Sequence, residues 1–98
     1  MDYHDDRFEW DKQKAATNLR NHGVSFEAAR LAFDEPNSVD IHLPDDGDGE
    51  VRWKQLCLGL VGVLVVIYTE REGDDGLTRT RIISVWKANK HEQARYTA

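Results

Sequence analysis

The stretch TRTRIISVWKANKHEQARY, from Thr78 to Tyr96, carries the strongest structural signal in this chain. Its apolar, β-branched centre predicts a strand, and the pair Asn89 and Glu92 after it is typical of the capping box that begins a helix. Basic side chains frame this junction on both sides: Arg79, Arg81, Lys87, Lys90, His91 and Arg95. Positive charge therefore gathers where a strand gives way to a terminal helix.

Charge is divided unequally along the chain. Residues 1–50 carry 13 acidic and 5 basic side chains, a net −8, and residues 51–98 carry 5 acidic and 8 basic ones, a net +3. The total of −5 argues against a general nucleic-acid coat, and the cationic second half favours a local site for an anion. The alternative is a solvated edge strand and a polar surface helix, because clustered charge is often only an exposed face.

Length and composition predict one domain over residues 1–98. A chain of 98 residues with 40% hydrophobic content can build a single modest core. The single cysteine, Cys57, excludes an intrachain disulfide and favours a reducing, cytoplasmic compartment. The acidic start lacks the apolar segment of a signal peptide. The most apolar stretch, Leu58–Ile67, is about half the length that crosses a bilayer and predicts a buried strand, with no membrane contact.

The order of patterns predicts an α+β fold. A first strand around residues 7–11 precedes two helices, one capped by Asp11 and stopped at Gly23, the other capped by Ser25. Strands follow near residues 38–43, 50–59, 62–70 and 77–85, and a last helix follows Asn89. Short connections favour antiparallel pairing. We expect the helices to pack on one face of a small antiparallel sheet, in the order β-α-α-β-β-β-β-α.

Helical spacing predicts which side chains face the core. The expected positions are Ala15, Leu19 and His22 on the first helix, and Phe26, Ala29 and Phe33 on the second. Cys57 is expected to be inert core. His22, just before Gly23, is expected to make a cap or dipole contact at the helix end.

The segment PDDGDGE, from Pro44 to Glu50, is rich in Asp and Gly without completing a calcium-loop pattern. A hairpin turn is the better interpretation, and the loop Arg71–Gly76 has equally strong turn chemistry. The sequence therefore predicts no metal site and no cofactor.

The chain resembles the BrnT family of type II toxin–antitoxin toxins. The matching segments follow the family order and span most of the chain: FEWDKQKAATNLRNHGVSFEAARLAFD (Phe8–Asp34), GEVRW (Gly49–Trp53), YTER (Tyr68–Arg71) and TRIISVWKANKHEQARY (Thr80–Tyr96). The resemblance implies a ribonuclease with a RelE-like fold. It also implies a BrnA-type antitoxin with a ribbon-helix-helix part, through which the complex contacts DNA only indirectly. The complex is expected as a dimer or heterotetramer.

One position departs from the family pattern. Trp86 stands where the family commonly has an Arg in the final strand. Arg would supply a charged, planar fork for a phosphate, whereas Trp offers one N–H donor and a stacking face.

Metal-independent RNA cleavage needs a proton acceptor, cations for the developing phosphorane charge, and an acid for the leaving 5′-oxygen. The candidate catalytic residues are Glu70, Arg79, Arg81 and Lys87. The candidate substrate-binding residues are Arg52, Arg71, Trp86, His91 and Arg95. Arg79 and Arg81 share one face of a strand, as a phosphate clamp requires, and the alternative is cross-strand pairing with Glu70 or Glu72. Trp86 is either a core residue or a stacking platform for a base.

Two functions remain open at this stage. The first is a metal-independent endoribonuclease toxin that inhibits translation and is silenced by its antitoxin. The second is a catalytically weakened homologue that binds the antitoxin and serves in autoregulation, which Trp86 favours. For either, we expect an antitoxin segment against the sheet near Arg79 and Arg81, with Phe26 or Trp10 as apolar anchors if they are not core.

Overall fold

The structure, a computed structural model, describes residues 1–45 and 47–98. Its elements are β1 (Asp2–His4), β2 (Phe8–Asp11), α1 (Lys12–His22), α2 (Phe26–Ala32), β3 (Val39–His42), β4 (Trp53–Gly59), β5 (Gly62–Glu72), β6 (Thr78–Lys87) and α3 (Lys90–Thr97). The predicted α+β class and element order are confirmed, and β1 is an additional short strand. Tyr3 of β1 stacks on Trp10 of β2, with ring centroids 4.3 Å apart. None of the helices in the described ranges is both long and apolar enough to cross a membrane.

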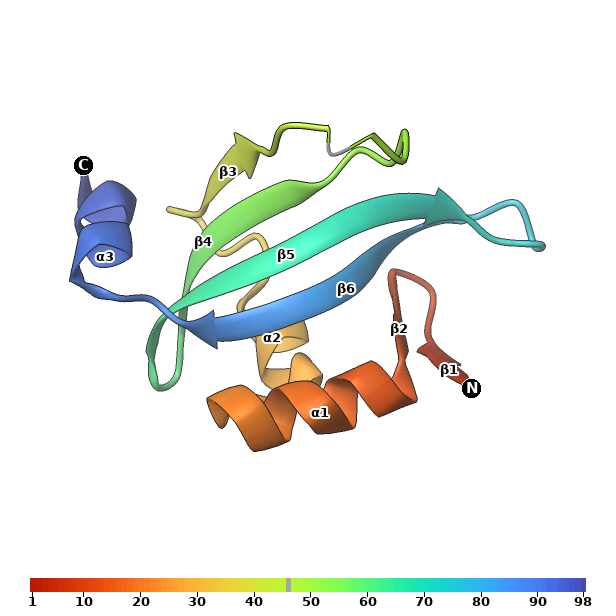
Figure 1. The fold of residues 1–98 in the computed structure, drawn as a ribbon, viewed down its shortest axis with the longest axis horizontal. Coiled ribbons are helices and arrows are strands. Elements are labelled where there is room, and N and C mark those ends of the chain that lie inside the picture. Colours follow the sequence, from red (N-terminus) through yellow and green to blue (C-terminus); the bar gives the residue numbers. More distant parts are fainter. Residues whose placement is uncertain (46) are drawn as a thin grey trace.

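The described strands form one sheet in the order β1-β2-β6-β5-β4-β3 (Figure 1). The pairs β3–β4, β4–β5 and β5–β6 are antiparallel as predicted, because short turns join them. β2, however, runs parallel to β6, so the sheet is mixed rather than purely antiparallel. These two strands lie far apart in the sequence, and no local turn reveals their relative direction.

α1 and α2 cover one face of the sheet and enclose the main core. The predicted caps are present: Asp11 and Ser25 accept hydrogen bonds from the first turns, and Gly23 ends α1 with a φ of 71°. The buried side chains of this core come from α2, the connection between α1 and α2, and four strands: Phe8, Trp10, Val24, Phe26, Ala29, Ala32, Cys57, Leu64, Val66, Ile82 and Val85. Cys57 is fully buried as predicted, and burial raises the pKa of its thiol to about 12.

Two predicted core positions on α1 are wrong. Leu19 is half exposed and His22 is exposed, whereas the buried residue of this helix is Asn18. Asn18 is buried because α1 packs against the edge of a strand. β2 pairs with β6 only at Phe8 and Glu9, and α1 then runs beside the remaining edge of β6. A strand edge presents backbone N–H and C=O groups, which require a polar partner.

α3 packs against the opposite face, so the expectation that all helices share one face does not hold for it. Its capping box of Asn89 and Glu92 is confirmed. Tyr96 joins a second, smaller core cluster whose buried members are Leu56, Val65 and Ala88. The Tyr96 hydroxyl donates to Glu35 at 2.6 Å, which joins α3 to the segment that follows α2. The strands of the β3–β4–β5 meander carry apolar side chains on both faces of the sheet. α3 covers part of the face opposite α1 and α2.

A β-bulge divides β6 into two registers. Tyr68 pairs with Ile82, whereas the preceding residue, Ile67, pairs with Ser84. Because a bulge adds one residue, the side-chain alternation shifts by one beyond it. Arg79 and Arg81 therefore share a face with Trp86, and Lys87 points to the other face.

Candidate functional site

Arg79 is a structural residue in this fold. It is buried, and its guanidinium lies across the turn that joins β5 to β6. Its Nη1 donates to Asp75 Oδ1 at 3.0 Å, a second bond joins Nη2 to Asp75 Oδ2, and Nε donates to the Asp5 carbonyl oxygen. A Cβ on Gly73 would lie 2.5 Å from Arg79 Nη1, so glycine permits this close approach. The Arg79 guanidinium, which the sequence predicts to bind a phosphate, is thus bound to the carboxylate of Asp75.

The Asp75–Arg79 pair gives the first prediction. Hydrogen bonds from Arg79 lower the pKa of the Asp75 carboxyl to about 2, from 3.8. A lowered folded-state pKa contributes stability above the unfolded value and loses it as the pH falls toward the folded value. We expect Asp75→Asn to lower the thermal unfolding midpoint at pH 7, and the difference from the unmodified chain to shrink between about pH 4 and pH 2.

The neighbouring Asp74 is the matched control. It is exposed and has no ion pair in the described part of the chain. Asp74→Asn should leave the midpoint unchanged across the same pH range. Equal behaviour of the two variants in thermal scans would contradict a structural role for the pair.

Three of the other predicted arginines, Arg81, Arg52 and Arg71, are also engaged by carboxylates. Arg81 Nη1 binds Glu9, its parallel-register neighbour on β2, and lies 3.1 Å from Asp2 on β1. Arg52 pairs with Asp48 at 2.6 Å, and Arg71 lies 3.5 Å from Glu50. Arg79 and Arg81 share one face as predicted, but the observed partners are neither Glu70 nor Glu72. The acidic first half of the sequence therefore neutralises much of the cationic second half.

Glu70 lies far from Lys87 and does not form one site with it. Glu70 pairs with Thr80, seven residues before Lys87 on β6, which corresponds to about 23 Å along the strand. Its neighbours are Asp34, Asp40, Trp53 and Tyr68, around a hollow at the other end of the sheet. The four predicted catalytic residues thus do not converge, and their roles stay predictions.

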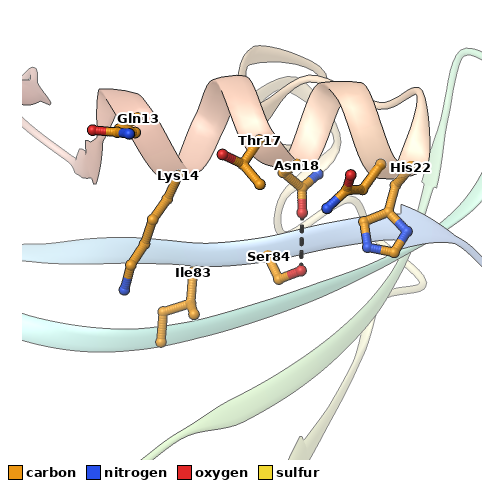
Figure 2. Close-up of a pocket in the computed structure, with 8 residues that line it drawn as sticks. Gln13, Lys14, Thr17, Asn18, His22, Ile83 and Ser84 are labelled. Carbon is orange, nitrogen blue, oxygen red and sulfur yellow. Dashed lines mark hydrogen bonds between the residues drawn. The ribbon is translucent and has the colours of Figure 1, made fainter.

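A groove runs between α1 and the edge of β6 (Figure 2). Figure 2 shows Lys14 reaching across β6 near Ile83, and His22 lying over the strand at the end of the helix. A second hollow lined by Asn21, His22, Trp86 and Lys87 adjoins it, since the two share Asn21 and His22. We call the combined surface the β6 groove and define it by Lys14, Asn18, Asn21, His22, Ile83, Ser84, Trp86 and Lys87.

Asn18 fixes the wall of the β6 groove. Its side-chain amide donates to the carbonyl oxygens of Val85 (2.8 Å) and Val24 (3.1 Å). Its Oδ1 accepts from the Val85 N–H at 3.1 Å and from the Ser84 hydroxyl at 2.9 Å. Asn18 therefore pairs with the edge of β6 as another strand would, and anchors α1 against it.

The cations of the β6 groove form no ion pair with a carboxylate among the described residues. Within the described ranges, no carboxylate lies within 4 Å of Lys14 or Lys87. The side chains of His22 and Trp86 lie near each other, with ring centroids 6.0 Å apart. The Trp86 indole also packs against the second core cluster, and its N–H points to Glu92 at 3.4 Å. Trp86 is thus partly buried, and its two interpretations, a core residue or a stacking platform, stay predictions.

His91 and Arg95 lie on the exposed surface of α3, beyond the end of β6. The sequence interpretation missed the part played by α1. Lys14, Asn18, Asn21 and His22 recur at helical spacings of four, three and one, which forms a polar stripe on one side of α1. That stripe was the available signal, and the assignment of Leu19 to the core obscured it.

Comparison with known proteins identifies the family of this chain. Residues 10–92 match the family described as ribonuclease toxin, BrnT, of type II toxin-antitoxin system. The chain belongs to the BrnT family. None of the curated proteins compared with the chain matches it. The matched range includes α1, all of β6 and the first residues of α3, so both sides of the β6 groove lie within the family domain. A BrnT toxin has RNA as its substrate class and an antitoxin as its protein partner.

Proposed function

We propose that this BrnT chain is a metal-independent endoribonuclease that binds RNA in the β6 groove and inhibits translation in the cytoplasm. The observation that carries the proposal is the contrast between the two ends of β6. The arginines near its start are held by carboxylates, whereas Lys87 and Lys14 form no ion pair among the described residues and border the partly buried indole of Trp86 and the exposed imidazole of His22. An anionic substrate is attracted to unneutralised charge in a concave site.

RNA cleavage of this type joins the 2′-oxygen to phosphorus and breaks the bond to the 5′-oxygen. We assign the proton transfers to His22, because imidazole is the commonest group for this role and His22 lies within the groove. Lys87 stabilises the charge on the phosphorane oxygens, and Lys14 binds a neighbouring phosphate. Trp86 stacks on a base. His91 is the second candidate for proton transfer, and Arg95 for a phosphate contact.

In this proposal the remaining predicted residues support the fold. Arg79 holds the β5–β6 turn and Arg81 ties β6 to β1 and β2. Arg52, Arg71 and Glu70 belong to the opposite end of the sheet from Lys87. Their substitution should affect stability more than the chemistry.

The second prediction concerns metal dependence. We expect the purified chain to cut RNA at an undiminished rate in excess EDTA, because the groove itself supplies the cations that a metal would otherwise provide. The measurement is cleavage of a labelled single-stranded RNA, with a divalent-metal nuclease as the positive control for chelation. Activity that disappears in EDTA and returns with magnesium would refute the proposal.

We further propose that the partner is a BrnA-type antitoxin with a ribbon-helix-helix part, and that the complex contacts DNA through this part alone. The family supports an antitoxin, and its class is our inference from the resemblance. The test is the reading frame beside this gene. Its product should co-purify with the chain and suppress RNA cleavage.

A catalytically weakened toxin that binds the antitoxin and serves in autoregulation is the second candidate. The observation that favours it is Trp86, whose N–H is directed at Glu92 and whose ring contacts the second core cluster. In that case the groove retains cations without a complete catalytic set. If the purified, folded chain binds RNA without cutting it, the weakened toxin is the correct function.

A further inference from the structure

A second surface of the molecule is apolar where a soluble fold normally has polar residues. The β4–β5 hairpin turns at Leu60 and Val61, which are 99% and 60% exposed. Two-residue hairpin turns usually contain Asn, Asp or Gly at these positions. Here the glycines flank the turn as the pair Gly59 and Gly62, and the tip itself presents two aliphatic side chains.

This tip forms one side of an apolar groove, which we call the hairpin groove. The opposite side is α2, where Leu31 is 75% exposed and Ala28 and Ala32 form the floor. The remaining lining residues are Leu58, Gly59 and Leu64, and the hollow has a volume of about 530 Å³. None of the lining residues carries a charge. An exposed apolar hollow of this kind is typical of a protein interaction site, and small residues on its floor let a partner approach closely.

The hairpin groove adjoins the β6 groove. Leu64, which lines the hairpin groove, pairs in register with Lys87 at the end of β6. Figure 1 shows the hairpin tip beside the end of β6. A segment that fills the hairpin groove therefore lies close to Lys87, to which we assign charge stabilisation.

We infer that the hairpin groove binds an amphipathic helix of the antitoxin, whose apolar side chains fill it and whose acidic side chains cover Lys87. The inference rests on the function proposed above. Two observations choose this occupant: the lining is apolar, which suits the anchors of a helix in a groove, and the adjoining charge is positive. Trp10 and Phe26, which the sequence offered as apolar anchors, are buried in the main core and cannot contact a partner.

The experiment uses the full chain and the purified product of the adjacent reading frame. Leu60→Asp and Leu31→Asp should each weaken binding by about 100-fold, because a charge in the centre of an apolar contact removes an anchor. Leu77→Asp is the matched control, since Leu77 is 46% exposed and lies in the β5–β6 turn, outside both grooves. It should change the dissociation constant by less than about threefold. Circular dichroism checks that each variant is folded.

RNA cleavage by the free variants separates this inference from the proposed function. Leu60→Asp should cut RNA at the unmodified rate and resist inhibition by the antitoxin. Unchanged antitoxin affinity in Leu60→Asp would refute the inference, as would failure of the unmodified chain to bind this product. A free chain that is dimeric in sedimentation, and that Leu60→Asp converts to a monomer, would assign the groove to a second copy instead. The unmodified chain could also fail to cut RNA while Leu60→Asp still loses antitoxin binding. That result would support the inference and refute the ribonuclease proposal.

Discussion

Lys87→Gln is expected to reduce RNA cleavage by about 100- to 1,000-fold and to abolish the growth arrest caused by the unmodified chain when it is expressed without antitoxin. The reason is electrostatic. Lys87 is exposed at the end of β6, has no carboxylate within 4 Å among the described residues, and borders His22 and Trp86. Gln keeps most of the side-chain length and removes the charge. The measurements are the single-turnover cleavage rate and the growth of cells after induction.

Lys90→Gln is the control for this prediction. Lys90 is also exposed, begins α3, and lies outside the β6 groove. It should retain cleavage within about threefold, because exposed charges that do not contact the substrate contribute little. Equal loss in both variants would show that general charge, rather than a site at Lys87, accounts for the activity.

Trp86→Arg separates the two functions that remain open. If the unmodified chain is toxic, the added arginine should leave or increase its toxicity. If cells grow normally while folded protein accumulates, and toxicity appears only in Trp86→Arg, the chain is a disabled toxin that retains its antitoxin-binding role. Toxicity in neither form would refute the ribonuclease proposal for this site.

The sequence predicted the local elements well because their signals are local. Asp11, Ser25 and Asn89 cap helices wherever those helices pack, and Gly23 ends α1 for reasons of backbone conformation alone. The side of the sheet to which α3 returns, and the parallel direction of β2 against β6, depend on contacts between distant segments. No spacing in the sequence encodes these contacts.

The candidate site was harder to predict, and the bulge in β6 shows why. Strict alternation would place Arg79, Arg81 and Lys87 on one face of the strand. The extra residue at the bulge turns Lys87 to the other face. The charge excess of the second half was also misleading, because carboxylates from β1, β2 and the turns lie against Arg79 and Arg81 in the folded chain. Among the described residues, the cations of the second half without an ion pair are Lys87, Lys90 and Arg95, and of these Lys87 borders α1.

Asn18→Ala is expected to lower the free energy of unfolding by about 3–5 kcal/mol. The change leaves the Val85 N–H and the carbonyl oxygens of Val85 and Val24 without their partner, and each buried unsatisfied group costs about 1–3 kcal/mol. The higher helix propensity of Ala offsets only about 0.7 kcal/mol. Chemical denaturation measures this loss, which is a large part of the total of about 5–15 kcal/mol for a small domain. Asn21→Ala, on the exposed surface of the same helix, is the control and should change stability by less than about 0.5 kcal/mol.

Hydrogen exchange gives this prediction a specific readout, because α1 has no other buried side chain to hold it against β6. In Asn18→Ala the amide of Val85 should exchange much faster, while the amide of Val66, on the opposite side of the same strand pair, should keep its protection until global unfolding. If the Val85 amide remains protected, the edge of β6 does not depend on the Asn18 side chain. If the Val85 amide loses its protection, the edge of β6 that forms one wall of the groove depends on the side-chain amide of Asn18. RNA cleavage should then fall in Asn18→Ala even at temperatures where the variant is fully folded, since Lys14 and His22 are carried on α1 and Lys87 on β6.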